Sequence, residues 1–156
     1  MMSGIKHAIK RLRRGKKIGL LVDGKSLGNS GIDVELSNIK NALGEIGNLR
    51  LAKVFLDELP SDDVSKAISK LGFLSIVHLN DLDIYMALEA MELAYNDKIK
   101  ILAIATDDEN LIPVLAKAKE RGKETVIVEM IEGTIGEGLR NSADYFCQFP
   151  KENTSE

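Results

Sequence analysis

Short apolar runs alternate along the chain with segments of helical period, and this alternation allows only a few folds. The apolar runs predict strands at about 17–22, 50–56, 74–78, 99–105, 124–129 and 144–148. The segments between them predict helices at about 33–46, 61–71, 82–96, 109–121 and 135–142. Strands that alternate with helices pair in parallel, because each helix carries the chain back across a face of the sheet. The sequence therefore predicts an α/β fold, a three-layer α/β/α sandwich with a mostly parallel sheet.

Residues with known capping preferences mark several helix ends. Asp33 and Ser61 are predicted N-caps, because their short polar side chains accept hydrogen bonds from free N–H groups. Gly47, Gly72 and Gly122 are predicted C-terminal stops, since glycine adopts the left-handed conformation that ends many helices.

The length of 156 residues matches one ordinary domain, which we place at 17–150. A basic N-terminal helix is expected before it, at 1–16, and a flexible polar tail after it, at 151–156. Cys147 is the only cysteine, so no intramolecular disulfide can form. No apolar run approaches the ~20 residues that span a bilayer, so we expect a cytoplasmic protein with no membrane partner. Homo-oligomer formation stays open.

Acidic residues stand directly after two of the predicted strands. Asp23 follows the apolar run 18–22, and Asp107 and Glu109 follow the run 101–106. Ligands bind outside the carboxyl ends of parallel strands, so these acids are expected at the same edge of the sheet. Asp108 is assigned to capping the next helix or to solvent, which leaves Asp107 and Glu109 to point inward if the turn is extended.

Two further acids belong to the predicted helix 82–96. Glu89 interrupts an almost wholly apolar stretch, so its carboxylate should be desolvated and should need a partner. Asp83 shares a ligand with Glu89 only if it lies at the helix start. The set Asp23, Asp83, Glu89, Asp107 and Glu109 predicts an oxygen-rich site for Mg²⁺ or Mn²⁺. A helix cap at Asp83, with a Glu89 carboxylate that reaches solvent, is the alternative.

Basic residues are concentrated at the N-terminus although the net charge is −3. Seven of the 21 lysines and arginines lie within the first 17 positions. Lysine and arginine neutralise phosphates, so this segment is a candidate RNA-binding flank, and a solvated helix face is the alternative. The predicted contact residues are Lys10, Arg11, Arg13, Arg14, Lys16 and Lys17.

Four short motifs occur in order over about Lys17 to Phe149. They are Val22-Asp23-Gly24-Lys25-Ser26, Leu82-Asp83-Ile84-Tyr85-Met86-Ala87-Leu88-Glu89, Ala105-Thr106-Asp107-Asp108-Glu109-Asn110-Leu111-Ile112-Pro113-Val114 and Leu139-Arg140-Asn141-Ser142-Ala143-Asp144-Tyr145-Phe146. They resemble the patterns V-D-G-x-N, v-D-v-x-x-x-x-D, S-G-D-S-D-F-x-P-L and L-x-x-x-A-D-x-F of the NYN domain, a branch of the PIN-like nuclease superfamily.

The resemblance implies a PIN-like fold and a divalent-metal-dependent ribonuclease that hydrolyses RNA phosphodiester bonds. It implies that Asp23, Asp83, Asp107 and Glu109 act in catalysis and hold Mg²⁺ or Mn²⁺ together with Glu89. Ser26 and Thr106 would support these acids through hydrogen bonds. The chain departs from the family pattern at Ser26, Glu89, Glu109 and Asn110, where the family has Asn, Asp, Asp and an aromatic residue. These departures support an alternative, a noncatalytic RNA-binding or protein-interaction module with a degenerate acidic site.

Overall fold

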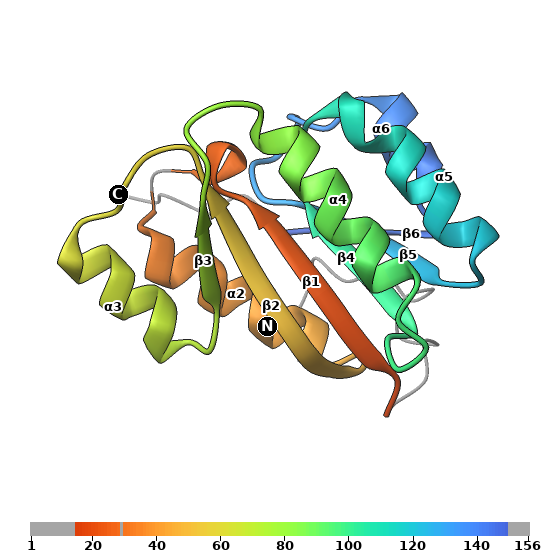
Figure 1. Ribbon diagram of the computed structural model, residues 1–156, viewed down its shortest axis with the longest axis horizontal. Helices are drawn as coiled ribbons and strands as arrows, with labels where there is room; N and C mark the ends of the chain where they lie inside the picture. The colour runs from red at the N-terminus through yellow and green to blue at the C-terminus, as the bar shows by residue number, and fades with distance from the viewer. Residues whose placement is uncertain (1–14, 29, 150–156) are drawn as a thin grey trace, which may run out of the picture.

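Six parallel strands form the sheet of the computed structural model, which describes residues 15–28 and 30–149 (Figure 1). The strands are β1 (Lys17–Asp23), β2 (Asn48–Leu56), β3 (Leu74–Val77), β4 (Ile101–Ala105), β5 (Glu124–Glu129) and β6 (Tyr145–Gln148). Every pair of neighbouring strands is parallel. All six predicted strands are therefore confirmed, and their ends differ from the predicted ones by two residues at most.

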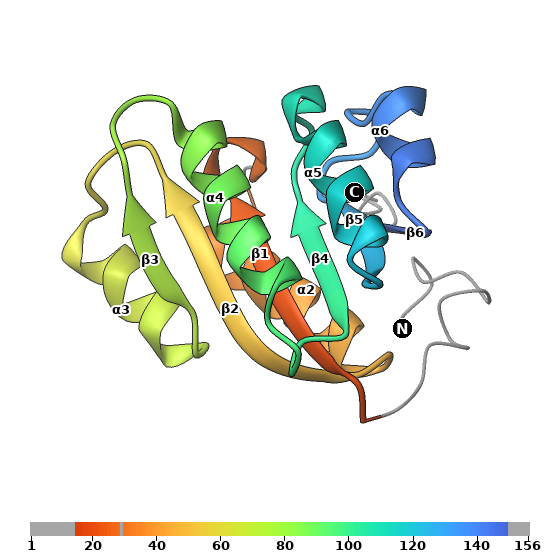
Figure 2. The same ribbon diagram turned by 45° about the vertical axis from the view of Figure 1, so that its right-hand side comes forward.

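Helices cover both faces of this sheet (Figures 1 and 2). The helices α2 (Ile32–Gly44) and α3 (Asp62–Lys70) lie on one face, where Leu36 and Ile68 pack with Leu20 and Val54. The helices α4 (Leu82–Ala94), α5 (Ile112–Glu120) and α6 (Glu137–Ser142) lie on the other. The alternate residues of each strand point to opposite faces and so supply two hydrophobic cores. The predicted three-layer sandwich is confirmed.

The strand order is β3-β2-β1-β4-β5-β6. The chain adds strands outward from β1 to β3, returns to the centre at β4, and then adds strands in the opposite direction. The order thus reverses between β1 and β4, and open α/β sheets bind ligands outside the carboxyl ends of strands at such a point. The spacing of the strands along the sequence did not reveal this order. The carboxyl ends lie toward the top of Figure 1.

The predicted helix starts are confirmed in part. Ser61 is the N-cap of α3 and accepts a hydrogen bond from Val64 N at 3.2 Å. The prediction for Asp33 is wrong, because α2 begins at Ile32 after Gly31. Gly31 has a φ of 100°, which favours glycine, and Asp33 instead lies in the first turn, where the helix dipole favours an acid.

The predicted helix ends are confirmed at two glycines and wrong at a third. Gly72 and Gly122 have φ values of 85° and 84° and follow α3 and α5, as predicted. The prediction for Gly47 is wrong, because α2 ends earlier, with Glu45 as its C-cap. A β-carbon at Gly47 would lie 2.6 Å from the Lys16 carbonyl oxygen, so glycine is required there by a close backbone approach.

The predicted helix at 109–121 has two parts, a short 3₁₀ turn η2 (Glu109–Leu111) and α5. Of the predicted N-terminal helix at 1–16, only Gly15 and Lys16 are described, and these two residues are not helical; residues 1–14 and the tail at 151–156 lie outside the described residues. Within the described part of the chain, no helix is both long and apolar enough to cross a membrane. Cys147 is buried, and burial raises the pKa of its thiol to about 12, so this thiol is an unreactive core group at neutral pH.

Candidate functional site

A serine hydroxyl joins two acids that come from different strands. Asp23 is the last residue of β1, and Asp107 lies two residues after the end of β4. The Ser26 Oγ lies 3.2 Å from Asp23 Oδ2 and 3.0 Å from Asp107 Oδ1. Asp107 also donates its backbone N–H to the same Oγ, at 3.1 Å. The two acids therefore meet where the strand order reverses, at the carboxyl edge of the sheet.

The glycine after Asp23 lets the chain turn at once. A β-carbon at Gly24 would collide with the carbonyl oxygen of Phe55, on the neighbouring strand β2. The 3₁₀ turn η1 (Gly24–Ser26) begins there, and Asp23 caps it by accepting a hydrogen bond from the Lys25 N–H at 3.0 Å. This tight turn is what presents Ser26 to Asp107.

Asp23 is a buried acid, since the residue is only 2% exposed. Burial raises its pKa above the ordinary value of 3.8, because the charged form loses solvation. Hydrogen bonds from Thr106 Oγ1, at 2.8 Å, and from the Lys25 N–H oppose this effect, since they stabilise the carboxylate. Burial is the larger cause. A carboxyl group with a raised pKa is a mark of functional sites.

The turn after β4 connects these acids with the start of α4. Asp108 is the N-cap of η2 and accepts a hydrogen bond from Asn110 N at 2.9 Å, which confirms its predicted capping role. The Asn110 Nδ2 donates to Asp83 Oδ2 at 3.1 Å. Asp83 is the second residue of α4 and so lies at the helix start, whereas Asp81 occupies the N-cap position. A neutral amide thus joins Asp83 to the turn that carries Asp107.

Glu89 has a basic partner instead of an acidic neighbour. Its Oε2 lies 2.6 Å from Lys53 Nζ, and the two side chains are 24% and 16% exposed. Lys53 comes from β2, so this ion pair ties α4 to the sheet. The expectation that Glu89 needs a partner is met by Lys53, which the sequence pattern had not identified.

Glu109 points toward α6. Its Oε2 lies 2.6 Å from the position of a β-carbon built on Gly136, the residue before that helix. Asp108, between Asp107 and Glu109, has an extended backbone, and the 3₁₀ turn η2 then begins at Glu109. Across residues 15–28 and 30–149, no three His, Cys, Asp or Glu side chains are close enough to hold one metal ion.

The pair of acids at the carboxyl edge nevertheless fits a hard cation. A hydroxyl has one proton, so Ser26 can donate to only one of its two carboxylate neighbours at a time. The other contact between Ser26 Oγ and a carboxylate then brings two oxygen atoms together with no hydroxyl proton between them. This contact favours a proton or a cation nearby. Mg²⁺ is commonly bound through one or two carboxylates and keeps several waters. Asp23 and Asp107 supply this kind of donor set.

A further buried acid, at the end of β5, was not among the predicted site residues. Glu129 is 1% exposed, and its Oε2 accepts a hydrogen bond from Ile135 N at 2.9 Å. Its Oε1 is buried and has no hydrogen-bond partner among the residues described. The signal in the sequence is the one that identified Asp23, an acid directly after an apolar run, here Val126-Ile127-Val128.

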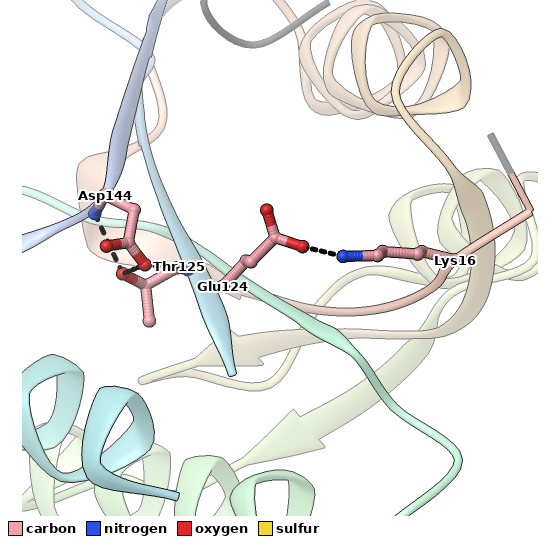
Figure 3. A network of polar contacts seen from close by, with 4 residues as sticks. All are labelled: Lys16, Glu124, Thr125 and Asp144. Carbon is pink, nitrogen blue, oxygen red and sulfur yellow. Dashed lines mark hydrogen bonds and ion pairs between the residues drawn. The ribbon is translucent and has the colours of Figure 1, made fainter. Parts of the chain in front are cut away.

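The predicted RNA-binding residues within the described chain lie at the opposite edge of the sheet. Lys16 forms an ion pair with Glu124, the first residue of β5 (Figure 3). Lys17 begins β1 and is exposed. Both are therefore at the amino ends of the strands, about 20 Å from the acids by the length of β1. Lys10, Arg11, Arg13 and Arg14 lie outside the described residues.

Asp144, in the fourth motif, has a structural role at that same amino edge (Figure 3). Its Oδ2 accepts hydrogen bonds from Thr125 N, at 2.9 Å, and from Thr125 Oγ1, at 3.1 Å. Its own N–H donates to Thr125 Oγ1 at 3.0 Å. These bonds hold the start of β6 beside β5.

Comparison with known proteins identifies a family model that matches this chain and a solved structure of the same fold. The model of the NYN domain family matches residues 17–150. The uncharacterized protein MJ0482 from Methanocaldococcus jannaschii is 33% identical over 143 residues, which is 91% of this chain, and the chain spans 59% of that relative's length. The crystal structure of a protein of unknown function, VPA0982 from Vibrio parahaemolyticus, superposes with a TM-score of 0.71. It is 16% identical and covers 87% of this chain and 94% of its own, so this likeness shows a shared fold.

Proposed function

Because this chain belongs to the NYN domain family, a nuclease-like and PIN-like domain, we propose that it is a divalent-metal-dependent ribonuclease. It hydrolyses RNA phosphodiester bonds at the carboxylate-lined edge of the sheet. The observation that carries the proposal is the contact of Asp23 and Asp107 through one hydroxyl, at the point where the strand order reverses.

Asp23 and Asp107 are the residues that hold Mg²⁺ or Mn²⁺ in this proposal. The cation, when bound, supplies a Lewis acid that polarises the phosphodiester and neutralises charge on the leaving oxygen. Thr106 fixes the Asp23 carboxylate and Ser26 fixes that of Asp107, so the two acids are positioned before any ligand arrives. Asp83 and Glu109 flank the pair on the α4 and α6 sides, where they can orient water or substrate.

Cleavage of a fluorescently labelled single-stranded RNA tests the proposal. We expect products with Mg²⁺ or Mn²⁺ and none in EDTA. Asp23→Asn and Asp107→Asn should each lower the rate by about 10²-fold or more, because the charge on the donor atoms is lost. Glu120→Gln is the matched control, since this exposed acid lies at the end of α5, and its rate should be unchanged.

Equal rates for wild type and Asp23→Asn would assign the products to a contaminating nuclease and overturn the proposal. A melting experiment gives an independent measure, because a ligand that binds only the folded state raises the melting temperature. Mn²⁺ should raise it in the wild type and in Glu120→Gln, and much less in Asp23→Asn and Asp107→Asn.

A noncatalytic RNA-binding or protein-interaction module is the second candidate. The observation that favours it is the separation of the acids, since Glu89 pairs with Lys53 and Glu109 points toward α6. This candidate predicts RNA or protein binding without cleavage in any metal, and no Mn²⁺-dependent change in the melting temperature.

A further inference from the structure

Two aromatic rings are stacked at the carboxyl edge of the sheet. The rings of His78 and Tyr85 have centroids 3.5 Å apart and planes inclined by 4°. His78 directly follows β3, and Tyr85 is the fourth residue of α4. The loop between them carries the chain from the sheet onto the helix, so the stack stands where two elements meet.

The stack lies close to the acids of the proposed active site. Asp23 is opposite Phe55 on β2, and Phe55 is opposite Ile76 on β3. Neighbouring strands are about 4.8 Å apart, so Ile76 lies about 10 Å across the sheet from Asp23. His78 is two residues beyond Ile76, past the strand end. Tyr85 is two residues after Asp83 in the sequence. Asp83 accepts a hydrogen bond from Asn110, in the turn that carries Asp107.

The stack reaches the surface through Tyr85, and His78 is half-buried. Tyr85 is 41% exposed, and the apolar residues beside the two rings in the sequence are exposed as well, Leu79 by 66% and Ile84 by 54%. Both members therefore stand outside the two buried hydrophobic clusters. Accessible aromatic and apolar surface next to a site rich in polar groups is typical of ligand binding.

Backbone hydrogen bonds fix the chain segments that carry the two rings. His78 donates its N–H to the Leu56 carbonyl at 3.0 Å, which fixes it to the end of β2. Asp81 has a φ of 58°, and its carbonyl accepts the N–H of Ile84 at 3.0 Å, which starts the helix. A preformed stack loses little conformational freedom when a further planar group is added.

We propose that the His78–Tyr85 pair is a base-stacking platform that binds a nucleotide of single-stranded RNA beside the acidic edge. This inference rests on the proposed function for the identity of its ligand. The bases of a single strand can turn outward and stack on aromatic side chains, whereas the bases of a duplex are already stacked on one another. Stacking needs no positive charge, which suits an edge lined by acids.

Affinity for a labelled single-stranded RNA in EDTA, measured by fluorescence anisotropy, tests the platform without cleavage. Tyr85→Leu should weaken binding by about 5- to 150-fold, because one stacked base is lost. Tyr85→Phe should retain the wild-type affinity, since the ring is kept. Tyr95→Leu is the matched control, because Tyr95 is also an exposed tyrosine, at 56%. It is the C-cap of α4, at the end of the helix away from the acids, and it packs under the Arg121 guanidinium. A duplex of the same sequence should compete poorly.

A series of oligonucleotides, each with one abasic site at a different position, gives a second measurement. Its first part uses only the wild-type protein, so it does not depend on a variant that might misfold. In the wild type, removal of one particular base should weaken binding more than removal of the others. That position-specific loss should vanish in Tyr85→Leu and persist in Tyr95→Leu. Equal binding by wild type and Tyr85→Leu, a flat abasic profile, or no binding of single strands by the wild type would each overturn the platform.

The outcomes also separate this inference from the proposed function. Tyr85-dependent binding without cleavage in any metal would overturn the ribonuclease and support the platform. Metal-dependent cleavage with binding that ignores Tyr85 would support the ribonuclease and overturn the platform.

Discussion

Asp23 is the residue on which the proposed site depends most. Its carboxyl group is almost fully buried, and burial raises its pKa although Thr106 and the Lys25 N–H both favour the charged form. An acid kept in this environment costs stability in the metal-free protein and favours a cation that offsets the cost. Selection for stability alone would favour a neutral residue here.

The pH dependence of stability tests this account of Asp23. Because its pKa is raised on folding, the unfolded chain releases the proton first as pH rises. The contribution of Asp23 to the free energy of unfolding should therefore decrease as pH rises above 3.8, and it should level off above the raised pKa. Urea unfolding of wild type and Asp23→Asn in EDTA, from pH 3 to pH 7, measures this contribution as a difference.

Asp23→Asn should be the more stable protein at pH 7, and its advantage should shrink as pH falls from the raised pKa of Asp23 toward 3.8 and change no further below 3.8. A variant that is less stable than wild type at every pH would mean that the hydrogen bonds of Asp23 outweigh its burial. Asp23 would then be a structural cap of η1.

At the scale of elements, α4 is fixed to the sheet by packing and by one ion pair. Met86, Ala90 and Leu93 pack into the core, and Glu89 reaches Lys53 on β2. Both partners are partly shielded from water, so removal of either one would leave the other partly desolvated and unpaired. The same helix presents Asp83 and Tyr85 at the carboxyl edge, so the position of α4 matters to both proposals.

Glu89→Gln tests whether this acid supports the helix or holds metal. We expect the free energy of unfolding to fall by about 1–2 kcal/mol, because Lys53 loses its charged partner. The Mn²⁺-dependent rise in melting temperature should match that of the wild type. A Mn²⁺ response lost in Glu89→Gln but kept in Lys53→Met would instead assign Glu89 to the metal.

At the scale of the whole molecule, the acids of the proposed site and the described residues of the predicted basic flank lie at opposite edges of the sheet. Asp23 and Asp107 follow the carboxyl ends of β1 and β4, whereas Lys16 and Lys17 stand at the amino end of β1. Lys16 is already paired with Glu124. A strand of RNA that contacts both edges has to extend over about 20 Å of protein surface.

Replacing Arg11, Arg13 and Arg14 by Ala tests the basic flank. Binding of unrelated single strands should weaken by similar factors, because phosphate contacts read no sequence. The slope of log K against log salt should flatten by about 0.7 for each phosphate that the variant no longer neutralises. Filter binding over a salt series measures both, and a triple Ala variant at the exposed residues Lys66, Lys70 and Lys119 is the charge-matched control. Equal slopes of log K against log salt in the two triple variants would mean that the basic N-terminal segment is a solvated helix face that does not contact RNA.

The sequence by itself determined the fold class and the edge at which acids gather. The periods of strands and helices are local properties, so the alternation predicted six strands and a three-layer sandwich. Asp23 and Asp107 could be assigned to the carboxyl edge because each follows an apolar run, and this rule needs no knowledge of strand order. Applied to the run before Glu129, the same rule would have identified a further acid.

Only the tertiary structure decided which of these groups are neighbours. Pairing of β1 with β4 brings Asp23 and Asp107 to the same hydroxyl, and no local pattern specifies that pairing. The partner of Glu89 comes from a strand 36 residues away along the chain, and η2 turns Glu109 toward α6. Side-chain partners depend on long-range packing and on the conformation of short turns. Sequence periodicity contains neither, so the acids that follow β1 and β4 could be placed at the carboxyl edge and the partners of each acid could not be predicted.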